Sequence, residues 1–176
     1  GLEDAGGVLD WLENETSRQA DGIERIRHFL DSSAAQTEFS QEAKVLRQLA
    51  NSDAAVYVID ARESVLPKYR DELTILSWCA KPLMPVFNFT QNCDISAWQE
   101  MLVRRGLHVS SRFDTVAFDF EGEMRLWHNL AVMLPPNDTL SQLTTARRQN
   151  WEALNTQAKQ AVARFLLDVA AFKQSY

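Results

Sequence analysis

The chain has 176 residues, of which 45% are hydrophobic, so it is long enough to fold around a sizeable core. Its 24 acidic and 18 basic side chains give a formal net charge of −6, which argues against binding nucleic acids through their phosphates. No apolar run approaches the ~20 residues that a membrane-spanning helix requires.

The N-terminus and the cysteines indicate a cytoplasmic protein. The chain opens with acidic residues and has no Lys or Arg before Arg18, unlike a secretory signal. Cys79 and Cys93 lack metal-ligand spacing, so we expect two free thiols. Because the sequence starts at Gly1 and not at methionine, we expect either a piece of a longer protein or a cloning remnant at this end.

The first 50 residues predict three short helices. Apolar residues recur there at spacings of three and four, and acidic residues stand near the expected helix starts. The predicted helices cover residues 6–16, 21–31 and 39–50.

Residues 54–134 alternate between apolar strands and helices, which predicts an α/β fold with a mainly parallel sheet. The predicted strands are residues 54–60, 83–88 and 115–118, and the predicted helices are 69–80, 96–105 and 122–134. The first two strands are apolar without alternation, so we expect helices to cover both faces. Three strands make a thin sheet, which suggests that further strands are missing.

Two polar residues end the apolar strands. Asp60 closes the first strand and Asn88 closes the second. Ligands of open α/β sheets bind in the crevice outside the carboxyl ends of the strands, so both residues are candidates for a site. For Asp60, capping of its own loop is the favoured interpretation. For Asn88, ligand contact and a role in forming the turn both remain open.

The sequence changes character after Pro135 and Pro136. Residues 139–172 contain no Gly or Pro and predict one helix of about 34 residues, roughly 50 Å long. Its apolar stripe consists of Trp151, Leu154, Ala158, Ala161, Phe165, Val169 and Phe172. We therefore divide the chain into residues 1–135 and 136–176. The stripe can be buried within this chain, by further helices or by self-association.

Several segments resemble the Era-like bacterial GTPases. The motifs that carry the resemblance are Val56-Tyr57-Val58-Ile59-Asp60-Ala61-Arg62-Glu63, Lys81-Pro82-Leu83-Met84-Pro85-Val86-Phe87-Asn88 and the opening Gly1-Leu2-Glu3-Asp4. The first two look like strands of that family, and Gly1 looks like the glycine of its DxxG motif. The C-terminal helix is similar to the start of a helical domain of unknown function that follows one such GTPase domain.

The resemblance implies a partial P-loop-GTPase-like three-layer sandwich, whose intact parent binds GTP and Mg²⁺ and acts as a regulatory switch. It implies Gly1 and Asn88 as nucleotide-binding residues, with no catalytic and no metal-binding residue in this chain. The phosphate-binding loop GxxxxGK[ST] is absent from the sequence, so we expect no activity from this chain alone. Phe89 and Gln91 depart from the Asn-Lys-x-Asp motif, which predicts weak guanine selectivity.

Two other functions remain open. The chain can be a degenerate GTPase-like scaffold that binds no nucleotide, or a doubly wound enzyme unrelated to GTPases. Whether an intact parent is a slow GTPase is also open. We expect no nucleic-acid partner.

Overall fold

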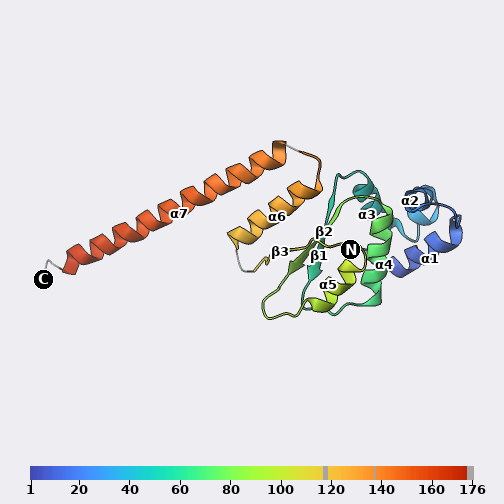
Figure 1. Ribbon diagram of the computed structural model, residues 1–176, viewed down its shortest axis with the longest axis horizontal. Coiled ribbons are helices and arrows are strands. Elements are labelled where there is room, and N and C mark those ends of the chain that lie inside the picture. Colours follow the sequence, from blue (N-terminus) through green and yellow to red (C-terminus); the bar gives the residue numbers. More distant parts are fainter. Residues whose placement is uncertain (117–118, 137, 174–176) are drawn as a thin grey trace. The chain divides into compact units, whose positions relative to one another are not determined.

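The structure is a computed structural model, and it describes residues 1–116, 119–136 and 138–173. Its contacts divide the chain into two compact units, residues 1–134 and 135–176 (Figure 1). In chain order the elements are α1 (Ala5–Glu15), α2 (Gly22–Asp31), the 3₁₀ turn η1 (Ala34–Gln36), α3 (Ser40–Ala50), β1 (Ala55–Asp60), α4 (Pro67–Trp78), β2 (Leu83–Asn88), α5 (Ser96–Val103), β3 (Ser111–Arg112), α6 (Phe120–Met133) and α7 (Asp138–Lys173).

The helices begin where side chains satisfy the free backbone N–H groups of the first turn. Asp4 accepts a hydrogen bond from the Gly7 N–H at the start of α1. Asp21 and Glu24 form a reciprocal capping box at the start of α2. The helix α4 begins at Pro67, two residues before the predicted start, because proline is well suited to the first helical position.

The three strands form one parallel sheet in the order β1-β2-β3. Ala55 pairs with Leu83 at one end of the β1–β2 ladder, and Asp60 pairs with Asn88 at the other. The short strand β3 pairs with β2 through Ser111 and Arg112. A mixed α/β fold with a parallel sheet and a long C-terminal helix is therefore confirmed.

The third strand was predicted at the wrong residues. It was expected at residues 115–118, but Thr115 and Val116 lie outside any strand, and residues 117–118 lie outside the described part of the chain. The strand that pairs with β2 is Ser111–Arg112. These two polar residues carry no apolar signal, and only their pairing with β2 makes them a strand.

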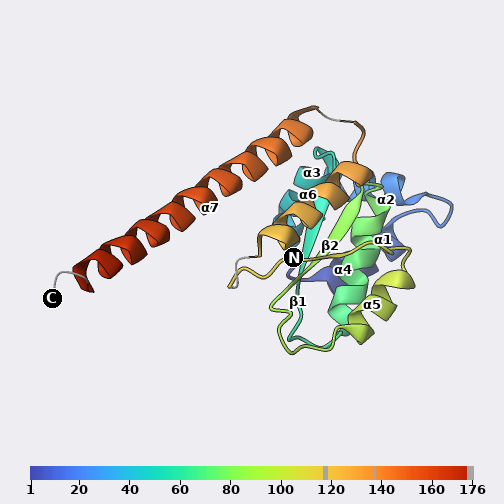
Figure 2. The ribbon, with the colours of Figure 1, turned by 60° about the vertical axis from the view of Figure 1, so that its left-hand side comes forward.

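Helices lie on both sides of the sheet in the first unit (Figure 1). Tyr57 and Ile59 of β1 belong to the main apolar cluster, together with residues of α1 to α5. On the other side α6 packs against β3, and Asn129 donates a hydrogen bond to Ser111 Oγ over 2.8 Å. Figure 2 shows the same elements from a second direction.

One face of β1 is not covered, contrary to the sequence-based expectation. Val56 is 46% exposed and Val58 is 64% exposed. Tyr57, which lies between them, and Ile59, which follows Val58, point to the other face and are buried. The strand β2 is covered on both faces, since Met84, Pro85, Val86 and Phe87 are all buried. The expectation failed for β1 because its outer face has no described helix packed over it.

The second unit consists mainly of α7, a helix of 36 residues. It carries large exposed apolar side chains, which are Leu143, Leu154, Val162, Phe165, Leu166, Leu167, Val169 and Phe172. None of the described helices is both long and apolar enough to cross a lipid bilayer. The exposed side chains concentrate in the last third of α7, where apolar residues occur on most sides of the helix.

Candidate functional site

Asp60 and Asn88 stand side by side at the carboxyl edge of the sheet, as the sequence predicted. Asp60 caps its own loop: it accepts hydrogen bonds from the Arg62 backbone N–H at 3.0 Å and from Arg62 Nε at 2.9 Å, and its Oδ2 lies 2.6 Å from Arg62 Nη2. The side-chain hydrogen bond to Arg62 is the main cause that lowers the pKa of Asp60, followed by the backbone hydrogen bond. Asp60 is therefore an ionised loop cap.

Asn88 ties the end of β2 to a later part of the chain. Its Oδ1 accepts hydrogen bonds from the Phe89 N–H at 2.9 Å, from the Thr115 N–H at 3.0 Å and from Thr115 Oγ1 at 3.2 Å. Its Nδ2 has no acceptor among the described residues. Asn88 thus organises the turn after β2, and its amide nitrogen can still donate to a ligand.

Phe89 follows in an unusual backbone conformation. Its φ of 57° lies in the left-handed region, which is uncommon for a bulky residue and costs about 1 kcal/mol. The centre of the Arg62 guanidinium lies 3.9 Å from the centroid of its ring, a cation–π contact. The contact with Arg62 and the hydrogen bond of its N–H to Asn88 together hold this conformation. Asp60, Arg62, Asn88 and Phe89 form one connected cluster, which we call the carboxyl-edge cluster.

Gly1 lies elsewhere, beside the buried carboxylate of Glu72. A Cβ built on Gly1 would lie 2.5 Å from Glu72 Oε1, and the same atom accepts a hydrogen bond from the Leu2 N–H at 2.5 Å. Glu42 accepts a hydrogen bond from the Asp4 N–H at 3.0 Å. Gly1 lines a hollow beside β1 that includes no residue of the carboxyl-edge cluster. The negative charge of the Glu72 carboxylate would repel a phosphate at this point.

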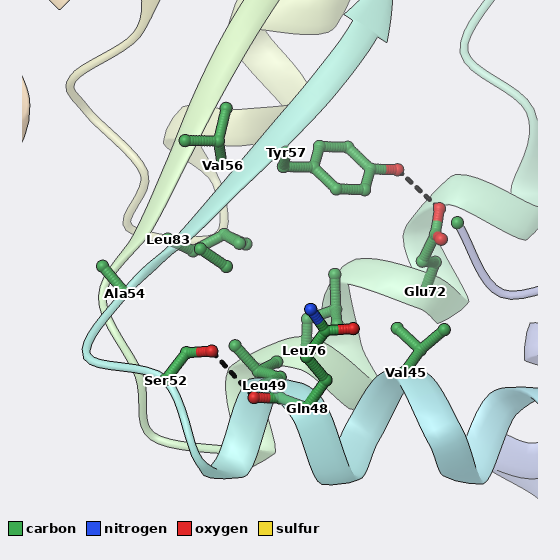
Figure 3. Close-up of a pocket in the computed structure, with 12 residues that line it drawn as sticks. Val45, Gln48, Leu49, Ser52, Ala54, Val56, Tyr57, Glu72, Leu76 and Leu83 are labelled. Carbon is green, nitrogen blue, oxygen red and sulfur yellow. Dashed lines mark hydrogen bonds between the residues drawn. The ribbon is translucent and has the colours of Figure 1, made fainter.

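A groove runs along β1 between the strand and α3 (Figure 3). It has a volume of about 280 Å³, and its lining includes Val45, Gln48 and Leu49 of α3. At its inner end the Tyr57 hydroxyl donates a 2.7 Å hydrogen bond to Glu72 (Figure 3). Burial raises the pKa of Tyr57, and Glu72 raises it further through this bond. The groove is otherwise mostly apolar.

Cationic side chains gather at the opposite, amino-terminal edge of the sheet. Lys81 and Pro82 precede β2, and Arg105 and His108 follow α5; all four line one hollow of about 440 Å³. Helices of a parallel α/β fold run opposite to the strands, so their carboxyl ends meet at this edge. The negative ends of the helix dipoles stabilise cations at this edge. The cationic cluster therefore does not require a ligand to explain it.

The structure offers no metal centre among the residues it describes: no three His, Cys, Asp or Glu side chains there come together. Cys79 and Cys93 are free thiols, as predicted.

Sequence reasoning missed the buried carboxylates and the stack of Arg62 on Phe89. A signal for Glu72 was available, because it falls between Tyr69 and Leu76 on the apolar side of α4. The Arg62–Phe89 contact joins two loops and has no such signal.

Comparison with known proteins adds one similarity. A family model described as a domain of unknown function (DUF3482) matches residues 99–176, which begin inside α5 and continue through α6 and α7. No curated protein and no solved structure matches the chain. The C-terminal part of the chain is thus similar to a family whose description assigns it no activity.

Proposed function

We propose that this chain is the C-terminal part of a GTPase-like domain, followed by the start of a helical domain. The intact protein would be a nucleotide-dependent switch related to the Era-like GTPases and acting in the cytoplasm. In the intact protein Asn88 contacts the edge of the base, Gly1 lies towards the terminal phosphate, and GTP and Mg²⁺ are held mainly by segments outside this chain. The supporting observation is the position of Asn88. It ends the middle strand of a parallel sheet, where such folds bind ligands, and its Nδ2 is available to donate.

The same cluster supports a site with weak base selectivity. A guanine-specific site requires a carboxylate that pairs with the ring N–H and the exocyclic amine, and Gln91 cannot supply one. Phe89 offers a ring face, on which any base can stack. Without a phosphate-binding loop this chain alone has no measurable GTPase activity.

The test uses the full-length parent. The coding sequence upstream of Gly1 should encode GxxxxGK[ST], and calorimetry should then detect GTP and GDP. Asn88→Ala should weaken binding roughly tenfold or more, since it removes the base contact. Gln91→Ala is the matched control, because Gln91 is exposed and should change affinity little. Null binding, or equally weak binding of GTP, GDP and ATP, would defeat guanine-nucleotide switching.

A second candidate is a scaffold that binds no nucleotide. Two observations favour it: Asn88 Oδ1 already accepts three hydrogen bonds, and Gly1 faces the Glu72 carboxylate. A scaffold needs a binding surface, and α7 exposes Leu154, Phe165 and Leu167 along residues 151–172. This face would contact a helical partner or a second copy of α7. Absence of a phosphate-binding loop from the parent, with retained partner binding, would establish the scaffold.

A further inference from the structure

The guanidinium of Arg62 covers one face of the Phe89 ring. Its central carbon lies 3.9 Å from the ring centroid, which is van der Waals contact, so nothing fits between the two groups. Arg62 belongs to the loop after β1, and Phe89 follows β2. The covered face is therefore the one turned towards β1. A base that stacked on this face would need the space that the guanidinium occupies.

This face borders the expected ligand crevice. Such crevices lie outside the carboxyl ends of neighbouring strands, and Asp60 of β1 pairs with Asn88 of β2 at that end. The Ala61 N–H also donates a hydrogen bond to the Asn88 carbonyl oxygen over 2.9 Å, which holds the two loops together. We therefore expect a ligand that accepts a hydrogen bond from Asn88 Nδ2 to meet Phe89 on the side that Arg62 covers.

Arg62 is held weakly enough to move. Its side chain is 60% exposed, and among the described residues the hydrogen bonds of its guanidinium all go to Asp60. Exposed ion pairs and exposed cation–π contacts each stabilise a structure only weakly. A hollow of about 300 Å³ lies beside Arg62, and its lining includes the acidic residues Glu63 and Asp94. A displaced guanidinium therefore has both room and negative charge nearby.

We propose that Arg62 gates base stacking in the nucleotide site: a nucleobase binds against Phe89 and Asn88 only after the guanidinium of Arg62 has left the ring. The inference rests on the proposed function and extends it, because it names a residue that opposes binding. Removing a cation ordinarily weakens the binding of an anionic nucleotide, since attraction to the phosphate is lost. A gate predicts the reverse, namely tighter binding without Arg62.

Nuclear magnetic resonance of the full chain measures the gate directly. The ring current of Phe89 should shift the side-chain resonances of Arg62 upfield, and titration with millimolar GMP or AMP should remove this shift while the side-chain amide resonances of Asn88 move. Arg62→Gln should tighten the binding of both nucleotides roughly three- to tenfold, because two weak exposed contacts hold the gate closed. Arg62→Lys keeps the charge but loses the planar group, so its affinity should lie between those of the native chain and Arg62→Gln.

Two controls separate gating from other effects. Arg104 at the far end of α5 is also exposed and paired with a carboxylate, that of Glu100. Arg104→Gln therefore matches the change in charge and should leave the affinity unchanged or slightly lower. Phe89→Leu removes the ring, and it should abolish both the upfield shift of Arg62 and the binding gained in Arg62→Gln. Circular dichroism should show that all these variants stay folded.

Three results would overturn the gate. They are nucleotide binding that leaves the Arg62 shift unchanged, an affinity of Arg62→Gln no higher than that of Arg104→Gln, and no movement of the Asn88 amide in either the native chain or Arg62→Gln. The proposed function fails separately, if calorimetry of the full-length parent detects no nucleotide. Binding by the parent together with an unchanged Arg62 shift would refute the gate alone.

Discussion

At the scale of single residues, Glu72 links three parts of the chain. Its carboxylate accepts hydrogen bonds from Tyr57 in the sheet and from the Leu2 N–H before α1, and it is almost fully buried on α4. A buried carboxylate is stable only while donors compensate for its lost hydration. The position of the N-terminal segment therefore depends on a residue that is 70 positions away in the sequence.

Tyr57→Phe tests this dependence. The change removes a buried hydrogen bond to a charged group, so we expect the free energy of unfolding to fall by about 2 kcal/mol. Urea denaturation monitored by fluorescence measures it. Tyr69→Phe is the matched control, because the hydroxyl of Tyr69 contacts Glu63 in an exposed position. The control should change stability by less than about 0.5 kcal/mol, and equal losses in the two variants would contradict the argument.

The raised pKa of Tyr57 predicts a loss of stability at alkaline pH. An unfolded chain loses the phenolic proton near pH 10, while the folded chain keeps it to higher pH. Above about pH 10 the unfolded state binds fewer protons, so the free energy of unfolding falls as the pH rises, and below that pH the contribution is complete. Urea midpoints between about pH 8 and 11 should fall more steeply for the native chain than for Tyr57→Phe. Parallel profiles would exclude Tyr57 as the cause.

The two thiols should differ in reactivity. Burial raises the pKa of Cys79 to about 11, whereas Cys93 lies half-buried in the loop after β2. Because the thiolate is the reactive form, iodoacetamide at pH 8 should modify Cys93 first and Cys79 only in urea. Mass spectrometry of the peptides gives the order, and early labelling of Cys79 would mean that the end of α4 opens readily.

At the scale of elements, the end of α4 adopts a conformation that suits glycine. Ala80 follows the helix with a φ of 51°, the left-handed conformation that commonly ends helices. Ala80→Gly should therefore raise the free energy of unfolding by roughly 0.5–1 kcal/mol. Ala131→Gly within α6 is the control, because Ala131 is also exposed but helical, and it should lower stability by a similar amount. Denaturation midpoints that shift in the same direction would rule out this explanation.

The same elements show what the sequence could predict. The strands β1 and β2 were predictable because their apolar runs end in Asp60 and Asn88, and the helices because apolar spacing and caps are local signals. The strand β3 was not predictable, since its two polar residues form a strand only because they pair with β2. The predicted carboxyl edge brings Asp60 and Asn88 together, but the arrangement of Phe89 depends on contact between two loops. The surroundings of Gly1 are set by Glu72 of α4. No local sequence pattern shows that α4 packs next to the N-terminal residues.

At the scale of the whole molecule, charge is divided unevenly along the chain. Residues 1–136 carry 13 basic and 21 acidic side chains, a net charge of −8, while residues 137–176 carry five basic and three acidic ones, a net charge of +2. Copies that associate through residues 1–134 bring two acidic units together. Copies that place α7 on the acidic unit of another copy bring opposite charges together.

Salt should therefore distinguish these modes of association. Between about 20 and 300 mM NaCl the Debye length shortens from roughly 20 Å to 6 Å, which screens both repulsion and attraction. Association through residues 1–134 should become tighter with salt, because repulsion between the acidic units is reduced. Sedimentation equilibrium at several salt concentrations measures the dissociation constant, with Phe165→Lys as the variant that changes the exposed apolar surface of α7. A dimer that weakens as salt is added would instead indicate charge attraction, as between α7 and the acidic unit of another copy, and would exclude contact between two acidic units as the main one.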